Sequence, residues 1–311
     1  MAVATADAQE QQPKRKVFKM ENWWGILWIL PSLLAVMVFV YGFIGWTARV
    51  SVSAWKGLLA DYTFVGADNY TALASDPRFE IDIQNTAIFT VVFVLGCLAI
   101  GLGLAILLDK GIRGEGFYRS LFLFPMAISF IVTGVVWRWL MNPAQGDDRL
   151  SGLNLLFDKA GLDFLINSWH NTPEWGIAAV AIPAVWQMSG YTMALYLAGL
   201  RAVPESLREA ARVDGASEFQ VYRKVVMPLI RPVTLSAIII LGHISLKVFD
   251  LIIAMAGKQV RLDVPAIHMW TTTFDGFLFG RGAAIGMVLL MSVAVLVIPY
   301  LWYTLRQERN V

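Results

Sequence analysis

The stretch Pro204–Pro228, PESLREAARVDGASEFQVYRKVVMP, is a polar interruption in an otherwise apolar sequence. Pro204 suits the first position of a helix, because its missing N–H costs nothing there. Glu205 follows in the first turn, where a negative charge interacts favourably with the helix dipole. Gly215 stands where a left-handed residue commonly ends a helix. These residues predict a short helix that begins at Pro204 and ends before Gly215.

A second short helix is expected after Gly215. Ser217 and Gln220 have the spacing of a capping box, in which each side chain bonds the backbone of the other residue. Pro228 marks where this second helix ends or bends, because proline has no N–H to donate. The first helix should carry an apolar face and a basic face by the i, i+3, i+4 rule. The apolar face holds Leu207, Ala210 and Ala211, and the basic face holds Arg208 and Arg212.

The composition is that of a membrane protein with several spans. Of the 311 residues, 57% are hydrophobic and 15% are charged, whereas soluble domains have about 25% charged residues. Cys97 is the only cysteine in the sequence, which excludes an intrachain disulfide. The three histidines lie far apart and no zinc-ligand spacing occurs, so we expect no metal site. The net charge of +2 gives no indication of nucleic-acid binding.

Six apolar runs are long enough to cross a membrane, since a span needs about 20 apolar residues. They cover residues 23–46, 84–108, 118–141, 174–200, 233–256 and 282–305. The sequence therefore predicts an all-α protein with six transmembrane helices. Two pairs of small residues are spaced for close helix packing, namely Ala99 with Gly103 and Gly282 with Gly286.

The placement of Lys and Arg predicts the orientation, because cytoplasmic loops carry an excess of both. The N-terminal tail and the segments on its side of the membrane hold 15 Lys and Arg, against 8 in the three opposite loops. Both termini and the stretch Pro204–Pro228 are therefore expected in the cytoplasm. Three parts follow: a disordered cytoplasmic tail at 1–20, an N-terminal transmembrane helix with an extracytoplasmic loop at 21–83, and the remaining spans with a cytoplasmic loop (201–231) at 84–311.

The polar stretch resembles the EAA loop of membrane subunits in ABC-type importers. The family pattern is Glu-Ala-Ala, three residues, Gly, nine residues, then Ile-x-Leu-Pro. The residues that match or adjoin it here are Glu209, Ala210, Ala211, Asp214, Gly215 and Pro228, with Val225 and Met227 in place of Ile and Leu. The resemblance implies the type I ABC importer permease fold and a loop that docks into a groove on a cytosolic ATPase subunit. Without the resemblance, the stretch reads as an amphipathic surface helix between two spans.

The resemblance runs from Gln84 to the C-terminus and is to sugar permeases of the maltose, glycerol-phosphate and α-glucoside type. It implies import of a carbohydrate across a bacterial or archaeal cell membrane. The implied partners are a second homologous permease, two ATPase subunits and an extracytoplasmic solute-binding protein. The resemblance also implies that ATP and magnesium bind the ATPase subunits. A Walker-A pattern is absent from this sequence, so we expect no cofactor and no catalytic residue on this chain.

Polar residues inside the spans are the candidates for a substrate path, because polar groups are costly there unless they face a bundle interior or water. They are Gln187 and Tyr191 in the fourth span and His243, Lys247 and Asp250 in the fifth. The string from Lys247 to Asp250 resembles the Lys-x-Phe-Asp segment of sugar permeases, but the following residues depart from the family's Gly-Gly-Pro loop. These side chains could instead bond neighbouring helices, and Lys247 and Asp250 have the spacing of a helical ion pair.

Two other functions stay open on the sequence. An ion-coupled secondary carrier could use Lys247 and Asp250 in proton coupling, but it needs no EAA loop. A membrane enzyme would need a catalytic motif, and the spans contain no HExxH sequence, Ser-Lys pair or carboxylate cluster.

The predicted topology can be tested by thiol labelling. Single cysteines replace Asp68 and Glu218 in a chain without Cys97, and intact cells are treated with an impermeant maleimide. We expect labelling of Asp68→Cys only, since the positive-inside rule places Glu218 in the cytoplasm. Labelling of Glu218→Cys from outside would overturn the orientation.

Overall fold

The computed structural model describes residues 23–142, 150–172 and 175–309. The predicted tail at 1–20 lies outside these residues. The chain divides into two units, Met1–Trp46 and Thr47–Val311. Within the described residues the secondary structure is helical apart from one isolated β-bridge between Ser53 and Phe64. The all-α prediction is therefore confirmed.

The first unit contains the N-terminal apolar helix. It begins with α1 (Trp23–Val36), continues through a π-helical turn η2 (Met37–Gly42), and leads into α2 (Phe43–Ser51), which crosses into the second unit. Residues Trp28–Ser51 are long and apolar enough to span a membrane. Its large apolar side chains from Trp28 to Phe43 are exposed, as a lipid-facing helix requires.

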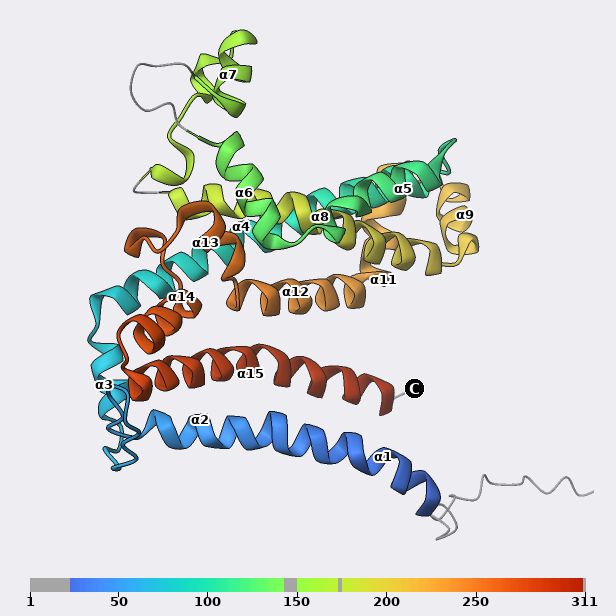
Figure 1. The fold of residues 1–311 in the computed structure, drawn as a ribbon. Coiled ribbons are helices and arrows are strands. Elements are labelled where there is room, and N and C mark those ends of the chain that lie inside the picture. Colours follow the sequence, from blue (N-terminus) through green and yellow to red (C-terminus); the bar gives the residue numbers. More distant parts are fainter. Residues whose placement is uncertain (1–22, 143–149, 173–174, 310–311) are drawn as a thin grey trace, which may run out of the picture. The chain divides into compact units, whose positions relative to one another are not determined.

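The second unit consists of long helices joined by short ones (Figure 1). The long helices and the segments that complete them are α4 (Pro77–Asp109), α5 (Glu115–Leu123), α6 (Phe130–Leu140), α8 (Gly176–Ala202), α12 (Arg231–Leu246), α13 (Asp250–Ala256) and α15 (Phe279–Arg309). The short helices are α3 (Asp68–Ala74), α7 (Gly152–Lys159), α9 (Glu205–Val213), α10 (Glu218–Val221), α11 (Met227–Leu229) and α14 (Pro265–Trp270). The remaining short turns are η3 (Phe124–Ala127), η4 (Asp163–Leu165), η5 (Trp169–Asn171), η6 (Tyr222–Val226), η7 (Val260–Leu262) and η8 (Thr271–Asp275).

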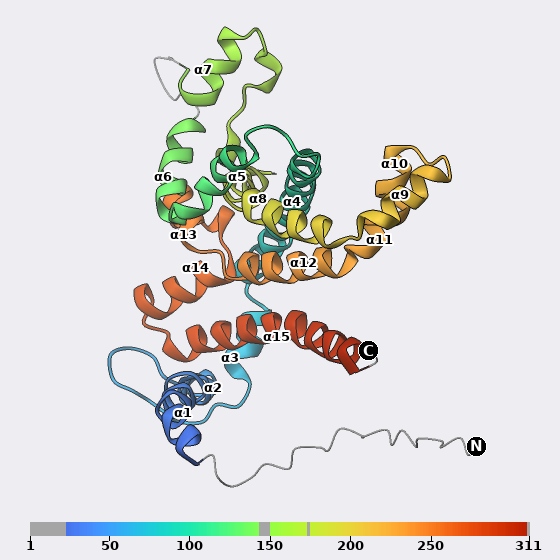
Figure 2. The ribbon, with the colours of Figure 1, turned by 90° about the vertical axis from the view of Figure 1, so that its right-hand side faces the viewer.

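Helices α4 and α8 pack side by side and form the centre of the second unit (Figures 1 and 2). Two glycines on α4 permit this approach. A Cβ on Gly96 would lie 2.8 Å from a Val185 methyl, and one on Gly101 would lie 2.7 Å from the Cβ of Thr192. Core side chains such as Phe93 fill the space between α4, α8 and the neighbouring helices. The two helices therefore interlock at close range along much of their length.

Three helices in the described part of the chain are long and apolar enough to span a membrane, and two bent helix pairs bring the number of candidates to five. The predicted span at 118–141 is one such pair, bent by 96° between α5–η3 and α6. Pro125 lies at the start of η3, and Ser129 caps α6 by accepting from the N–H of Val132. The predicted span at 233–256 stops at Leu246 and resumes at Asp250. The sequence predicted one transmembrane helix for each run, and neither run forms a single continuous helix.

Helix α4 starts seven residues earlier than the predicted span, because its first turns find partners for their polar groups. Asp76 caps the helix by accepting from the N–H of Arg78 at 2.9 Å. Arg78 Nε in turn donates to Asp263 at 2.6 Å, and the buried Asp82 lies 2.5 Å from His268 Nδ1. The charged run at the start of α4, which was predicted as part of a loop, is thus helical. It is covered by α14 and by the segment that precedes α14.

Of the two small-residue pairs that were predicted to pack against other helices, only the pair in α15 makes close contacts within the described residues. Gly282 packs against Thr273, and a Cβ on Gly286 would lie 3.3 Å from the sulfur of Met269, which confirms close packing at the start of α15. Ala99 and Gly103 are exposed, and no atom lies within 4 Å of a Cβ built on Gly103. Within the described residues that pair makes no close helix contact, because the face of α4 that meets α8 carries Gly101 instead.

Gly101→Ala and Gly103→Ala form a matched test of this packing. The first substitution should lower the free energy of unfolding by about 1–3 kcal/mol, the usual cost of an overpacked interior. The second should leave stability unchanged or slightly raised, since it adds no contact and removes a flexible glycine from a helix. The measurement is the thermal unfolding midpoint of each variant in detergent. Equal midpoints, or a lower one for Gly103→Ala, would contradict the packing described here.

Candidate functional site

The polar stretch, called here the EAA segment (Pro204–Pro228), begins with helix α9. Pro204 is the residue before the first turn and not its first member, so the predicted position was one residue off. The helix ends in two crossed backbone bonds, from Gly215 N–H to Arg212 O and from Ala216 N–H to Ala211 O, each 3.0 Å long. This is the Schellman arrangement, which requires a left-handed residue. Gly215 has φ +81°, as predicted.

Helix α10 begins at the predicted capping box. The N–H of Ser217 donates to Gln220 Oε1 at 2.8 Å. The helix continues through η6 and α11 and then bends by 66° at Ile230 into α12. Pro228 lies in α11, two residues before the bend, in agreement with the prediction that it marks the end or bending of the helix.

The two faces of α9 differ from those predicted. Arg208, expected on the basic face, is buried at 8% exposure, whereas Leu207 of the apolar face is 43% exposed. The reason is that Arg208 Nη1 donates to Asp109 Oδ2 at 2.8 Å and Nη2 donates to the carbonyl of Leu200 at 2.6 Å. Charge-assisted hydrogen bonds of this kind offset the cost of burying a guanidinium. Sequence reasoning missed this site, because Asp109 lies 99 positions away in the sequence.

The outward side of the EAA segment combines apolar side chains with a carboxylate. Leu207, Val213 and Phe219 are exposed at 43%, 87% and 72%. Glu209 and Ala210 are also exposed, and Glu209 makes no ion pair with any residue that the structure describes. Large apolar groups exposed on a short polar segment commonly mark a contact surface for another protein.

Arg212 links α9 to α10. Its guanidinium lies 2.9 Å from Glu205 and 2.7 Å from Glu218. Hydrogen bonds to Glu218 and then to Glu205 raise the pKa of Arg212 still further above its ordinary value. The group is therefore charged at every physiological pH, and because it is exposed, the pairs contribute little to stability.

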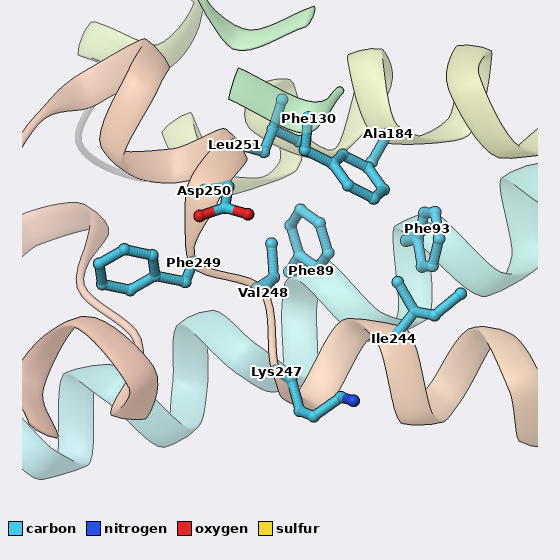
Figure 3. Close-up of a pocket in the computed structure, with 10 residues that line it drawn as sticks. All are labelled: Phe89, Phe93, Phe130, Ala184, Ile244, Lys247, Val248, Phe249, Asp250 and Leu251. Carbon is cyan, nitrogen blue, oxygen red and sulfur yellow. The ribbon is translucent and has the colours of Figure 1, made fainter. Parts of the chain in front are cut away.

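A second feature is a cavity of about 310 Å³ at the interruption between α12 and α13 (Figure 3). Ten residues from five helices and the interruption line it: Phe89, Phe93, Phe130, Ala184, Ile244, Lys247, Val248, Phe249, Asp250 and Leu251. Nearby, Thr90 donates to Ser245 Oγ at 2.9 Å, which joins α4 to α12. The lining is mainly aromatic and aliphatic with two charged side chains, the usual character of a small-molecule site.

Lys247 and Asp250 do not form the ion pair that their spacing allows. No ion pair between them occurs in the structure, and Figure 3 shows their charged ends pointing in different directions. The i, i+3 argument fails because α12 ends at Leu246, so Lys247 lies just beyond it, whereas Asp250 is the first residue of α13. Both side chains are exposed and lie beside the cavity.

His243 lines a different cavity, of about 530 Å³, between α12, α14 and α15. Lys247 and Phe249 line both cavities. His243 Nδ1 is buried and has no hydrogen-bond partner among the described residues. The structure therefore separates His243 from Asp250, while Lys247 lies beside both.

Gln187 and Tyr191 line neither of these cavities. Gln187 is buried, and its Nε2 donates to the carbonyl of Ile128 at 2.6 Å. That carbonyl belongs to the bend between η3 and α6, so Gln187 satisfies backbone freed by the broken helix. Tyr191 is half-buried and packs against the hydrophobic core. No group of three or more His, Cys, Asp or Glu side chains suited to a metal occurs among the described residues.

Comparison with known proteins gives a consistent result. Residues 97–309 match the family model described as the inner membrane component of binding-protein-dependent transport systems. A probable ABC transporter permease protein of Pyrococcus horikoshii is 40% identical over 92% of this chain and 97% of its own length. The xylose/arabinose import permease of Haloferax volcanii is 34% identical over 92% of this chain and 87% of its own. A solved bacterial ABC transporter that imports the acidic polysaccharide alginate has a similar fold, with TM-score 0.75, 19% identity and coverage of 94% and 96%.

Proposed function

We propose a specific role for this chain within the family to which it belongs, the inner membrane components of binding-protein-dependent transport systems. As a member, the chain is a multi-pass inner-membrane permease of an ABC importer and is not an enzyme. The role we assign is import of a carbohydrate, driven by ATP hydrolysis on partner subunits. The observation that carries this assignment is the interrupted helix between Leu246 and Asp250 at an aromatic cavity.

The interrupted helix supports a substrate path through the cavity. Non-helical backbone inside a membrane is tolerated where it is enclosed by protein or lines a cavity. Transporters commonly bind substrate at such discontinuous helices near the middle of the membrane. Lys247 and Asp250 border the interruption here and could hydrogen-bond a polar solute. His243 is also a candidate for substrate contact, because it lines the neighbouring cavity. Gln187 and Tyr191 line neither cavity, so they could affect the substrate path only indirectly, by positioning the helices that they contact.

The chemistry of the cavity favours a sugar. Four phenylalanines line it together with one ammonium and one carboxylate. The electron-rich faces of aromatic rings suit the C–H faces of a sugar ring, and the charged groups suit its hydroxyls. The names of the Haloferax relative and of the alginate transporter also refer to carbohydrates. The specific sugar stays open.

We propose six spans for the membrane topology. Four are the three long apolar helices and the bent pair of α5–η3 with α6. The fifth is α12 with α13, which follow the EAA segment. The sixth is α8, whose 27 residues suffice in length. Because neighbouring helices bury most of α8, its side chains need not be as apolar as those of a lipid-facing helix. With this topology and the positive-inside rule, both termini and the EAA segment face the cytoplasm.

The EAA segment is the proposed contact with the ATPase. Its exposed apolar groups and the free carboxylate of Glu209 suit a partner surface with an apolar groove and a basic side chain. The complex would contain a second homologous permease, two ATPase subunits that bind ATP and magnesium, and an extracytoplasmic solute-binding protein. No observation favours an ion-coupled carrier, which would not need the EAA segment.

Substitution of the two charged cavity residues tests the path. Asp250→Asn and Lys247→Met should each raise the apparent KM for transport about tenfold, the effect of one lost hydrogen bond to a charged group. Labelled D-xylose, L-arabinose and an alginate oligosaccharide are tested as probes in proteoliposomes that contain the whole complex and its binding protein. The best-transported probe is then used to compare the variants.

Asp68→Asn is the matched control, because it removes an exposed carboxylate far from the cavity in sequence. It should leave the apparent KM unchanged. If the assembled Asp250→Asn and Lys247→Met variants both keep the original KM, the cavity is not the substrate path.

Two changes in the EAA segment test its contact with the ATPase. Gly215→Val should strain the left-handed turn by about 1 kcal/mol or more, although the space around it is free. Glu209→Lys reverses the exposed charge. Both variants should insert normally in the membrane yet retain less ATPase when the complex is purified. They should also lose the stimulation of ATP hydrolysis by loaded binding protein.

Gly215→Asn is the control for the turn, since asparagine tolerates left-handed backbone better than valine. It should behave nearly as the original chain. Full ATPase retention and full stimulation in both Gly215→Val and Glu209→Lys would show that this segment is not the contact.

A further inference from the structure

The buried ion pair between Arg208 and Asp109 is a feature that the function proposed so far does not use. The two side chains are 9% and 5% exposed, and their closest nitrogen and oxygen atoms lie 2.8 Å apart. Tyr222 donates its hydroxyl hydrogen to the same Asp109 oxygen at 2.9 Å. The other charged residues of α9, such as Glu209, point outward. One charge of the EAA segment is thus turned into the protein.

The pair joins three elements that meet at one end of the second unit. Asp109 is the last residue of α4, and Arg208 lies in the middle of α9. Arg208 also bonds the carbonyl of Leu200 near the end of α8. Tyr222 begins η6, so both halves of the EAA segment contact the same carboxylate. Asp109 and Arg208 together therefore fix the EAA segment to the ends of the two central helices.

Helix α4 connects this junction to the cavity. It is continuous over 33 residues, and Phe89 and Phe93 on it line the 310 Å³ cavity. At 1.5 Å per residue, Phe93 lies about 24 Å from Asp109 along the helix. Close contact at Gly96 and Gly101 locks α4 to α8, so the two helices must move together. A displacement of α9 that pulls Asp109 would consequently move the wall of the cavity.

Burial of this pair is poorly explained by stability alone. Desolvation of two charges consumes much of their attraction, and an apolar pair of the same volume often stabilises a protein as well. In some proteins, what a buried polar pair with fixed geometry adds is a single register between the joined elements. A mechanical link needs such a register.

We propose that Asp109 is a positioning residue that transmits movement of the EAA segment along α4 to the cavity. Arg208 is its partner in this link, and Tyr222 orients the carboxylate. The proposal rests on the proposed function, because it assumes that the EAA segment contacts the ATPase. It identifies the point at which that contact is joined to the substrate path.

The test follows the reactivity of a cysteine at the cavity. The parent chain carries Val248→Cys and Cys97→Ala, and the whole complex is assembled in proteoliposomes. The rate of maleimide labelling is measured with and without ATP–vanadate trapping. In the parent, trapping should change the rate at least about fivefold, the lower end of typical coupling between two sites. No change in the parent would overturn the proposed function itself, and the link with it.

Three variants of the parent separate a link from simple structural support. They are Asp109→Asn, Arg208→Gln and the double variant, and each is first checked for retained ATPase subunits. The two single variants should respond to trapping less than about twofold, well below typical coupling. The double variant leaves no unpaired buried charge, so its stability should recover. Its labelling should nevertheless stay insensitive to trapping.

Glu115→Gln is the matched control, since it removes the partly exposed Glu115–Arg201 pair between α5 and α8. It should respond as the parent does. A double variant that regains the response would show that the pair only avoids an unpaired charge, and the proposal would fall. The proposal would also fall if both single variants responded to trapping as the parent does. The same holds if the single variants fail to assemble while the double variant assembles and responds.

Discussion

The close packing of α4 against α8 is the constraint on which the rest of the second unit depends. Gly96 and Gly101 bring the helices so near that side chains of α8 occupy the space a Cβ would need. The same two helices contribute the walls of the cavity through Phe89, Phe93 and Ala184. At their far ends they hold Arg208 of the EAA segment. Two helices packed in this way hold the cavity and the EAA segment at a fixed distance from each other.

Local signals in the sequence predicted local structure well. The left-handed Gly215 and the capping box at Ser217 depend on residues within one or two turns, and both are present. The apolar runs located the helices, since burial and lipid exposure both require apolar side chains. The membership of the permease family, indicated by the EAA pattern, is confirmed.

Features that depend on distant residues could not be predicted. Arg208 turned inward because Asp109 and the Leu200 carbonyl receive it, and no helical periodicity reveals those partners. Gln187 likewise bonds a carbonyl at the bend after η3, which was not foreseen as a bend. The interruption after Leu246 separates Lys247 from Asp250, so the rule of helical spacing did not apply. In each case a tertiary contact or a broken helix overrode a local pattern.

Cross-linking from the EAA segment to the ATPase is the most direct test of the central claim. Single cysteines replace the exposed Ala210 and the half-buried Ala211 in a chain without Cys97, and the assembled complex is treated with a photoactivatable thiol reagent. We expect a cross-link to the ATPase from Ala210→Cys and a weaker one from Ala211→Cys, with a yield that changes when nucleotide is trapped. An assembled complex with no cross-link from either position would contradict it.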